Sequence, residues 1–285
     1  MSSNESSARL TGSLLSFFAL TFAVTEPFFV GAALLSRDLP PGASLSIGLR
    51  ALVLTGTFAP AMVALALTAN AKGAAGVRAL LGQLFRSRVP ARFYAFAIGY
   101  MAAVKLVAAL LDRLITGAWP RFGFGTWYLM LAATLFSTVV GGQVGEELGW
   151  RGYALPRLAE RFGLGGASVV LGVCWALWHL PLFYLHGADT FGQSFPIYLS
   201  QVTAISVAMA WLYWRTAGSL LLTMLMHAAI NNISGIVPSV PRPAANPLLP
   251  QASLFSILGA LVLWAGASYL LIRMRRAKLS SAPIE

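Results

Sequence analysis

Hydrophobic residues in this chain occur in long continuous runs and do not alternate with polar ones. Several runs reach about 20 residues, the length that a helix needs to cross about 30 Å of hydrocarbon. Only helices and closed barrels can satisfy their backbone inside a bilayer, and barrel strands alternate in polarity. The pattern therefore predicts an all-α fold, a polytopic transmembrane helical bundle.

About eight spans are expected. They are Leu10–Ser36, Leu45–Leu67, Phe93–Leu114, Trp127–Trp150, Gly166–Leu185, Ile197–Trp214, Ser219–Val237 and Leu254–Ile272. The first run is too long for the core of a signal peptide, so it is expected to remain as a span. No polar linker, internal repeat or low-complexity tract divides the chain, so residues 1–285 are expected to form a single membrane-embedded domain.

Composition agrees with a membrane location. Of the 285 residues, 58% are hydrophobic and 10% are charged, whereas soluble domains carry about 25% charged residues. The net charge of +11 resides mostly in short connecting segments, which is the pattern of topology signals and anionic-lipid contacts. The lipid bilayer is therefore an expected partner, and nucleic acid is not.

Basic residues concentrate in alternate connections. On one side of the predicted membrane lie Lys72, Arg78, Arg86, Arg88, Arg92, Arg151, Arg157, Arg161, Arg215, Arg273, Arg275, Arg276 and Lys278. The connections on the other side hold fewer. The positive-inside rule then predicts a multi-pass protein of the cell membrane with both termini in the cytoplasm, as an even number of spans requires.

The scarce ionisable residues indicate where chemistry could occur. The chain has nine acidic residues and three histidines. Glu146 and Glu147 end the fourth predicted span, while His179 and His227 lie inside the fifth and seventh. An ionisable group at membrane depth costs several kcal/mol unless it is paired or solvated, so it marks a functional site by default. Three spans that each contribute such groups predict one shared site.

Helical spacing assigns the two glutamates to different partners. Glu147 and Arg151 stand in i,i+4 relation with the acid first, which is the favourable order for an ion pair. Glu146 is rotated from Glu147 by about 100°, because a helix turns once in 3.6 residues. One carboxylate can therefore be held by Arg151 while the other faces a different helix.

The other two spans present polar groups on single faces. His227 and Asn231 share one face of their helix, and Trp175 and His179 share one face of theirs. His186, near the outer end of its span, is expected to be interfacial, and Asn232 lies off the His227 face. The result is a carboxylate, two imidazoles and a carboxamide that could point inward from three helices.

This set of groups suits hydrolysis. A carboxylate in a low-dielectric cavity can act as a general base toward water, and an imidazole can hold that water. A second imidazole and an amide can donate hydrogen bonds to a developing oxyanion. Glu146, His179 and His227 could instead supply three ligands to a divalent metal such as zinc, with the fourth position open for water. The sequence contains no His-Glu-x-x-His helix motif, and whether a metal is used stays open.

Three segments resemble the motifs of a known family. Glu146-Glu147-xxx-Arg151, Trp175-xxx-His179 and His227-xxx-Asn231 resemble, in order and spacing, the three motifs of the CPBP family. This family contains the CAAX-prenyl endopeptidases and the bacteriocin-processing or immunity proteins, also called the Abi family. The core motifs cover residues 146–231. The second motif usually begins with Phe, and here it begins with Trp175.

The resemblance implies an intramembrane endopeptidase whose site opens toward the cytoplasm. It implies that Glu146, helped by His179, activates water. It also implies that His227 and Asn231 stabilise the oxyanion, and that Glu147 and Arg151 brace the site. Family members are often described as metalloproteases, although the prenyl-endopeptidase branch is argued to be a glutamate protease without metal.

The expected partner is a membrane-associated peptide or protein substrate, and lipidated peptides are among the candidates. Two other functions stay open at this point. One is a non-catalytic bacteriocin-immunity or scaffold protein built on the same bundle. The other is a proton-coupled transporter, because membrane Glu and His residues also relay protons. Transporters often carry paired inverted repeats, which this sequence does not show.

One difficulty concerns depth. At 1.5 Å per residue, Glu146 would sit near the inner edge of its span while His179 would lie roughly 20 Å into the membrane. The two side chains can meet only if the fourth helix continues past Trp150 or if the helices tilt strongly.

Overall fold

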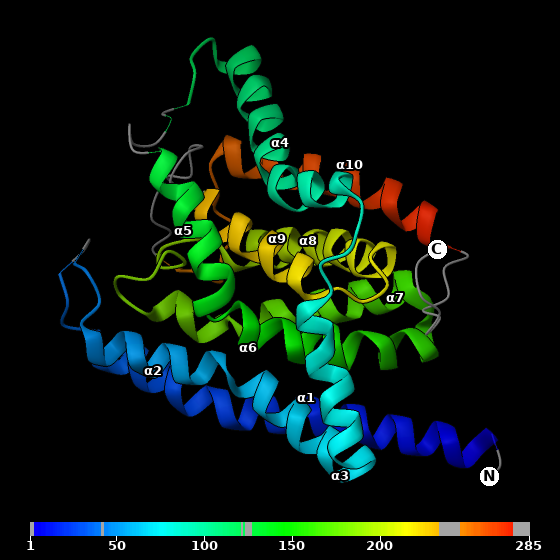
Figure 1. The fold of residues 1–285 in the computed structure, drawn as a ribbon. Coiled ribbons are helices and arrows are strands. Elements are labelled where there is room, and N and C mark those ends of the chain that lie inside the picture. Colours follow the sequence, from blue (N-terminus) through cyan, green and yellow to red (C-terminus); the bar gives the residue numbers. More distant parts are fainter. Residues whose placement is uncertain (1–2, 41–42, 121, 123–126, 234–245, 276–285) are drawn as a thin grey trace.

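The computed structural model describes residues 3–40, 43–120, 122, 127–233 and 246–275. Within these ranges the regular structure is entirely helical (Figure 1), which confirms the predicted all-α fold. In chain order the elements are α1 (Ser3–Leu35), α2 (Ile47–Thr57), α3 (Ala59–Gly82), η1 (Gln83–Phe85), α4 (Ala91–Thr116), α5 (Trp127–Val140), α6 (Gln143–Glu147), η2 (Leu148–Ala154), α7 (Leu155–Trp178), η3 (Leu180–Tyr184), α8 (Phe195–Arg215), α9 (Leu220–Ile233) and α10 (Leu254–Met274).

Among the described residues, six helical stretches are long and apolar enough to cross a membrane. They are Ser13–Leu35, Ile47–Phe85, Ala91–Thr116, Gln143–Tyr184, Phe195–Arg215 and Leu254–Met274, and α9 is a shorter apolar helix. The stretch Gln143–Tyr184 contributes two passes, because the backbone of Gly163 is not helical (φ 67°, ψ 164°) and the chain folds back there. This arrangement agrees with about eight passes. The last residues of the predicted seventh span, 234–237, lie outside the described residues.

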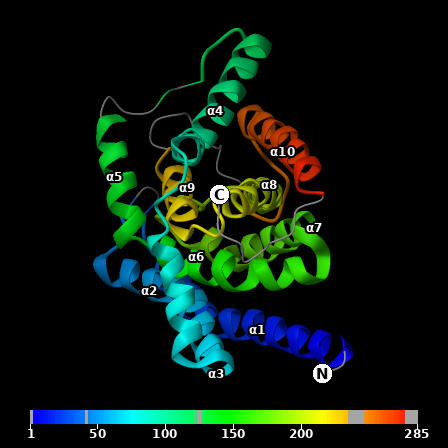
Figure 2. The same cartoon turned by 45° about the vertical axis from the view of Figure 1, so that its right-hand side comes forward.

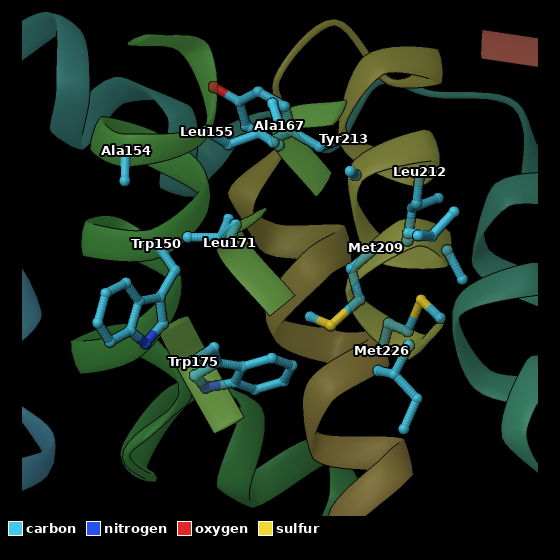
Figure 3. Packing of buried hydrophobic residues seen from close by; sticks show 14 of the residues in the cluster. Trp150, Ala154, Leu155, Ala167, Leu171, Trp175, Met209, Leu212, Tyr213 and Met226 are labelled. Atoms are coloured by element: carbon cyan, nitrogen blue, oxygen red, sulfur yellow. The ribbon is translucent and has the colours of Figure 1, made fainter. Parts of the chain in front are cut away.

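Two helices form the centre of the bundle. Figure 2 shows α8 and α9 enclosed by α4, α5, α6, α7 and α10, with α1, α2 and α3 packed outside α6 and α7. Small residues let α7 approach α8 closely, since a Cβ on Gly172 would lie 2.7 Å from Thr203 Cα. Figure 3 shows the ring of Trp175 extending from α7 toward the side of the core on which Met209 and Met226 lie.

The first helix begins and the last helix ends at the same end of the bundle. The first turns of α1 and the last turns of α10 lie at the same end in both views (Figures 1 and 2). An even number of passes requires this arrangement. That this end faces the cytoplasm stays a prediction.

The fourth predicted span, Trp127–Trp150, was wrong as a single helix. α5 ends at Val140 and a new helix begins at Gln143, so the chain bends at Gly141 and Gly142. From Gln143 the helix continues past Trp150, through η2 and into α7 as far as Gly163. The bend could not be predicted from the hydrophobic pattern, because two glycines do not interrupt an apolar run. Glu146 therefore lies near the beginning of this helix and not at the end of a span.

A glycine face holds this helix against the α2–α3 junction. Gly145 and Gly149 are one turn apart, and a Cβ on Gly145 would lie 2.7 Å from the carbonyl oxygen of Thr57. A Cβ on Gly149 would lie 2.6 Å from the carbonyl carbon of Pro60. The spacing is that of small-xxx-small helix contacts in membranes, in which backbones touch directly. It positions the segment that carries the two glutamates.

Candidate active site

The reversal at Gly163 brings Glu146 and His179 to the same depth. Glu146 precedes Gly163 by 17 residues and His179 follows it by 16, so two antiparallel segments place them level. In a straight helix the 29 residues between Glu146 and Trp175 would span about 43 Å, yet these side chains are hydrogen-bonded. The difficulty of depth is resolved because the helix does continue past Trp150.

The segment after the glutamates is a π-helical turn. The element η2 has seven residues, and the N–H of Leu155 that closes it donates to the carbonyl oxygen of Trp150, five residues earlier. Such turns are rare in proteins, and those that occur often lie at functional sites. Trp150 and Tyr153 from this turn pack against Phe17 of α1, with ring centroids 5.5 Å and 5.0 Å away. The turn is thus anchored on its outer side.

Glu147, Arg151 and His227 form one side of the site, which we name the bracing side. Arg151 Nη1 donates to Glu147 Oε1 at 2.8 Å, as the i,i+4 spacing predicted. The same oxygen lies 2.9 Å from His227 Nδ1. Glu147 and Arg151 are 0% exposed and His227 is 3% exposed. Since a carboxylate only accepts hydrogen bonds, this contact assigns a proton to Nδ1 of His227.

Glu146 and two imidazole nitrogens form the other side, which we name the reactive side. His179 Nε2 lies 4.0 Å from Glu146 Oε2, and His227 Nε2 lies 3.9 Å from Glu146 Oε1. Both separations exceed hydrogen-bond length. Trp175 Nε1 donates to Glu146 Oε2 at 2.6 Å, and Glu146 is 6% exposed. Each oxygen of one buried carboxylate therefore faces an imidazole across a gap.

Local contacts orient the ring of His179. Its Nδ1 lies 2.8 Å from the carbonyl oxygen of Trp175, and because a carbonyl accepts, Nδ1 donates. In the neutral ring Nε2 is then an acceptor that faces Glu146. Trp178 and Tyr198 flank the ring edge to face at 4.8 Å and 5.7 Å between centroids. These contacts fix both the tautomer and the direction of the ring.

The separations are too wide for a tetrahedral zinc site. Ligand atoms about 2.0–2.1 Å from a tetrahedral zinc lie about 3.4 Å apart. The carboxylate–imidazole separations here are 3.9 Å and 4.0 Å. Among the described residues, no group of three His, Cys, Asp or Glu side chains is arranged to hold a metal ion. The arrangement of Glu146, His179 and His227 therefore does not fit the predicted zinc alternative.

Of the six predicted site residues, the structure brings five together and leaves Asn231 at the margin. Asn231 is exposed one turn beyond His227, and within the described part of the chain it makes no hydrogen bond or ion pair. Asn232 donates to Ser137 Oγ at 3.1 Å, in line with its expected position off the His227 face. His186 lies apart from the site, with its Nδ1 3.2 Å from the carbonyl oxygen of Leu39.

Two aromatic contacts at the site were not predicted. Trp175 was identified only as the first residue of a motif on the His179 face, and its bond to Glu146 depends on the register of two antiparallel segments. Tyr198, on α8, lies edge to face against the ring of His179, with the ring centroids 5.7 Å apart. No spacing or charge signal in the sequence distinguishes Tyr198 from an ordinary aromatic residue of a span.

Comparisons with known proteins agree with this site. Residues 126–233, which contain all three motifs, match the family model described as type II CAAX prenyl endopeptidase Rce1-like. A protein of Methanococcus maripaludis named CAAX prenyl protease 2 is 28% identical over 235 residues, which cover 75% of this chain and 81% of that protein.

The fold and the comparisons define an integral membrane protein of a peptidase class. The comparisons also confirm what the three motifs indicated: the chain resembles a CPBP family protease.

Proposed function

We propose that this protein is an intramembrane endopeptidase in which Glu146 activates the water that hydrolyses a peptide bond. The observation that carries the proposal is the gap around Glu146. Its two oxygens face the Nε2 atoms of His179 and His227 at 4.0 Å and 3.9 Å. The peptidase class comes from the family comparisons, and the geometry supports these residues as its machinery.

The separation of Glu146 Oε2 and His179 Nε2 is short enough for one water molecule to bond to both atoms. At about 2.8 Å from each of two atoms that are 4.0 Å apart, it would subtend an angle of about 90°. Both atoms accept hydrogen bonds, so this water donates both of its hydrogens and keeps its lone pairs for a carbonyl carbon. As the new C–O bond forms, the water proton passes to Glu146, which acts as a general base.

His227 is suited to stabilise the oxyanion. Glu146 and Glu147 carry two negative charges and Arg151 one positive charge, so this buried group has a net charge of −1 with neutral histidines. An uncompensated buried charge is costly, and one further proton on His227 balances it. His227 then donates from Nδ1 to Glu147 and keeps its Nε2–H for the oxyanion. Asn231, one turn further on that face, adds an amide donor.

The second half of the reaction returns the proton. When the tetrahedral intermediate collapses, the C–N bond breaks and the proton held by Glu146 passes to the leaving nitrogen. The products are a new carboxylic acid, which keeps the second hydrogen of the water, and a new amine, and Glu146 is again a carboxylate. No redox partner or covalent enzyme intermediate is required.

The substrate is proposed to be a membrane-associated peptide that enters from the end of the bundle carrying the termini, which we place in the cytoplasm. His227 follows Leu220, the first residue of α9, by seven residues, or about 10 Å along the helix. The name of the Methanococcus maripaludis relative makes a prenylated CAAX peptide the first substrate to test. A lipid anchor would hold such a peptide beside a site at this depth.

The test uses the purified protein in liposomes. It is given a farnesylated peptide ending in Cys-aliphatic-aliphatic-X, and the same peptide without the lipid, with and without a zinc chelator. Mass spectrometry detects the released tripeptide. The wild type should cleave the farnesylated peptide with or without the chelator, and Glu146→Ala should not. If Glu146→Ala, at normal membrane abundance, keeps the protein's function in cells, the immunity or scaffold alternative is favoured.

A further inference from the structure

Trp175 contacts the proposed base in a way that packing does not require. Its indole N–H donates to Glu146 Oε2 at 2.6 Å, from a side chain that is 4% exposed. Hydrogen bonds from N–H groups to ionised carboxylates are shorter and about twice as strong as neutral ones. Among the described residues this is the one hydrogen bond to the Glu146 carboxylate. The rotation of the carboxylate therefore depends on Trp175.

The same indole contacts the bracing side. The guanidinium carbon of Arg151 lies 4.2 Å from the centroid of the Trp175 ring, and Arg151 is held by Glu147 at 2.8 Å. A cation over the face of an indole is attracted to its π electrons. It also draws electron density away from the N–H, which strengthens this group as a donor, and neighbouring hydrogen bonds polarise one another. The chain of contacts runs from Glu147 through Arg151 and Trp175 to Glu146.

The backbone of Trp175 acts on the second reactive group. Its carbonyl oxygen accepts from Nδ1 of His179, which leaves Nε2 of that ring facing Glu146. The side chain of Trp175 thus orients the proposed base, and its carbonyl fixes the tautomer of the imidazole opposite. The two atoms that would hold the water, Glu146 Oε2 and His179 Nε2, are both set by one residue.

We infer that Trp175 is a positioning residue. Its indole N–H holds the Glu146 carboxylate in the rotation that leaves 4.0 Å to His179 and 3.9 Å to His227, and it couples the Glu147–Arg151 pair to the base. The inference rests on the proposed function of Glu146. It assigns a role to the position where the motif usually has Phe, whose ring can pack in the same place but has no donor.

The kinetic test is Trp175→Phe, which keeps an aromatic ring beneath Arg151 and removes the donor. The matched control is Trp264→Phe on α10, which also loses one indole hydrogen bond, to Ser200 Oγ at 2.9 Å, away from the site. For a hydrogen bond to a charged group we expect kcat to fall by about 10- to 100-fold in Trp175→Phe. KM should change by less than about threefold, because Trp175 contacts the enzyme's own base and not the substrate. Trp264→Phe should stay within about twofold of wild type in both constants.

A spectroscopic test does not depend on activity. In the protein labelled with ¹⁵N-indole tryptophan, single Phe substitutions assign the N–H resonances of the other seven tryptophans, and the remaining resonance belongs to Trp175. A short, charge-assisted hydrogen bond places this proton downfield. Replacing Glu146 by Ala should move it upfield, while the Trp264 N–H should not shift. This measurement also tests the positioning role of Trp175 if Trp175→Phe does not fold in detergent.

The outcomes separate this inference from the proposed function. If Glu146→Ala still cleaves peptide, the proposed function fails whatever the resonance does. If Glu146→Ala is inactive, but Trp175→Phe folds and keeps kcat within twofold of wild type, the positioning role of Trp175 is refuted. An N–H resonance that does not respond to Glu146→Ala refutes it as well.

Discussion

The bracing side and the reactive side of the site are built on adjacent glutamates, yet their charges are compensated very differently. Glu147 accepts from Arg151 and from His227 through one oxygen at 2.8 Å and 2.9 Å, and it is fully buried. Glu146 is held by a single neutral donor, and its imidazole neighbours stand 3.9–4.0 Å away. The helix rotates by about 100° per residue, which is enough to give neighbouring carboxylates separate partners. The carboxylate of Glu147 is paired within the protein, and the carboxylate of Glu146 stays available to bind a water molecule.

The largest effect is expected where the bracing side is broken. Glu147→Ala leaves the buried guanidinium of Arg151 without its carboxylate, which should lower the free energy of unfolding by about 3–5 kcal/mol. Denaturation by SDS in mixed micelles measures it. The double variant with Met at positions 147 and 151 removes both charges and should recover most of this loss, but it should stay inactive because His227 loses its acceptor. A stable Glu147→Ala protein would contradict the assigned structural role.

Substitutions on the reactive side should lower the rate of peptide cleavage and leave the free energy of unfolding nearly unchanged. His179→Ala removes the acceptor proposed to hold the water opposite Glu146, so kcat should fall by about 100- to 1,000-fold. The matched control is His186→Ala, because that histidine lies apart from the site and should leave kcat within about twofold. Peptide cleavage in liposomes measures both variants. Equal rates for the two variants would remove His179 from the reactive side.

The position of both sides depends on the glycine face. Gly149→Ala places a Cβ 2.6 Å from the backbone carbon of Pro60, so η2 must move and the unfolding free energy should fall by about 1–3 kcal/mol. Gly99→Ala is the matched control, since a Cβ there meets nothing within 4 Å and should be neutral or stabilising by up to about 1 kcal/mol. If the two variants unfold alike, the close contact at Gly149 does not exist.

The smallest effect is expected at Asn231. Because it is exposed and has no hydrogen bond among the described residues, Asn231→Ala should lower kcat by less than about tenfold. Asn232→Ala is the comparison. It loses hydrogen bonds to Ser137 and Ala228, so it should cost about 1 kcal/mol of stability without changing the rate. A loss above 100-fold in Asn231→Ala would make this residue a full member of the reactive side.

Much of the fold and part of the site could be predicted from the sequence. The length of each hydrophobic run indicates a membrane span directly. The Glu147–Arg151 pair follows from the i,i+4 spacing within one helix. The bend at Gly141 and Gly142 could not be predicted, because glycines within an apolar run leave its hydrophobicity intact. The continuation past Trp150 was named only as one of two ways for Glu146 and His179 to meet, because Arg151 and Arg157 resemble the start of a polar connection.

The contacts between helices could not be predicted from the sequence. The bond from Trp175 to Glu146 depends on the register of two antiparallel segments, and no spacing within either segment determines that register. The same holds for Tyr198, whose place beside His179 follows from how α8 packs on α7. His227 and Asn231 do share one helix face, as predicted, yet residues on a shared face can differ in burial: His227 is buried and Asn231 is exposed.

The central claim is that Glu146 takes the proton of the attacking water. The most direct measurement is the single-turnover rate of Glu146→Gln, which keeps the size of the side chain and removes the base, recorded beside its thermal unfolding. The account predicts a rate at least about 1,000-fold below wild type, with the midpoint of unfolding shifted by less than about 3 °C. A folded Glu146→Gln protein that cleaves peptide within tenfold of the wild-type rate would contradict it.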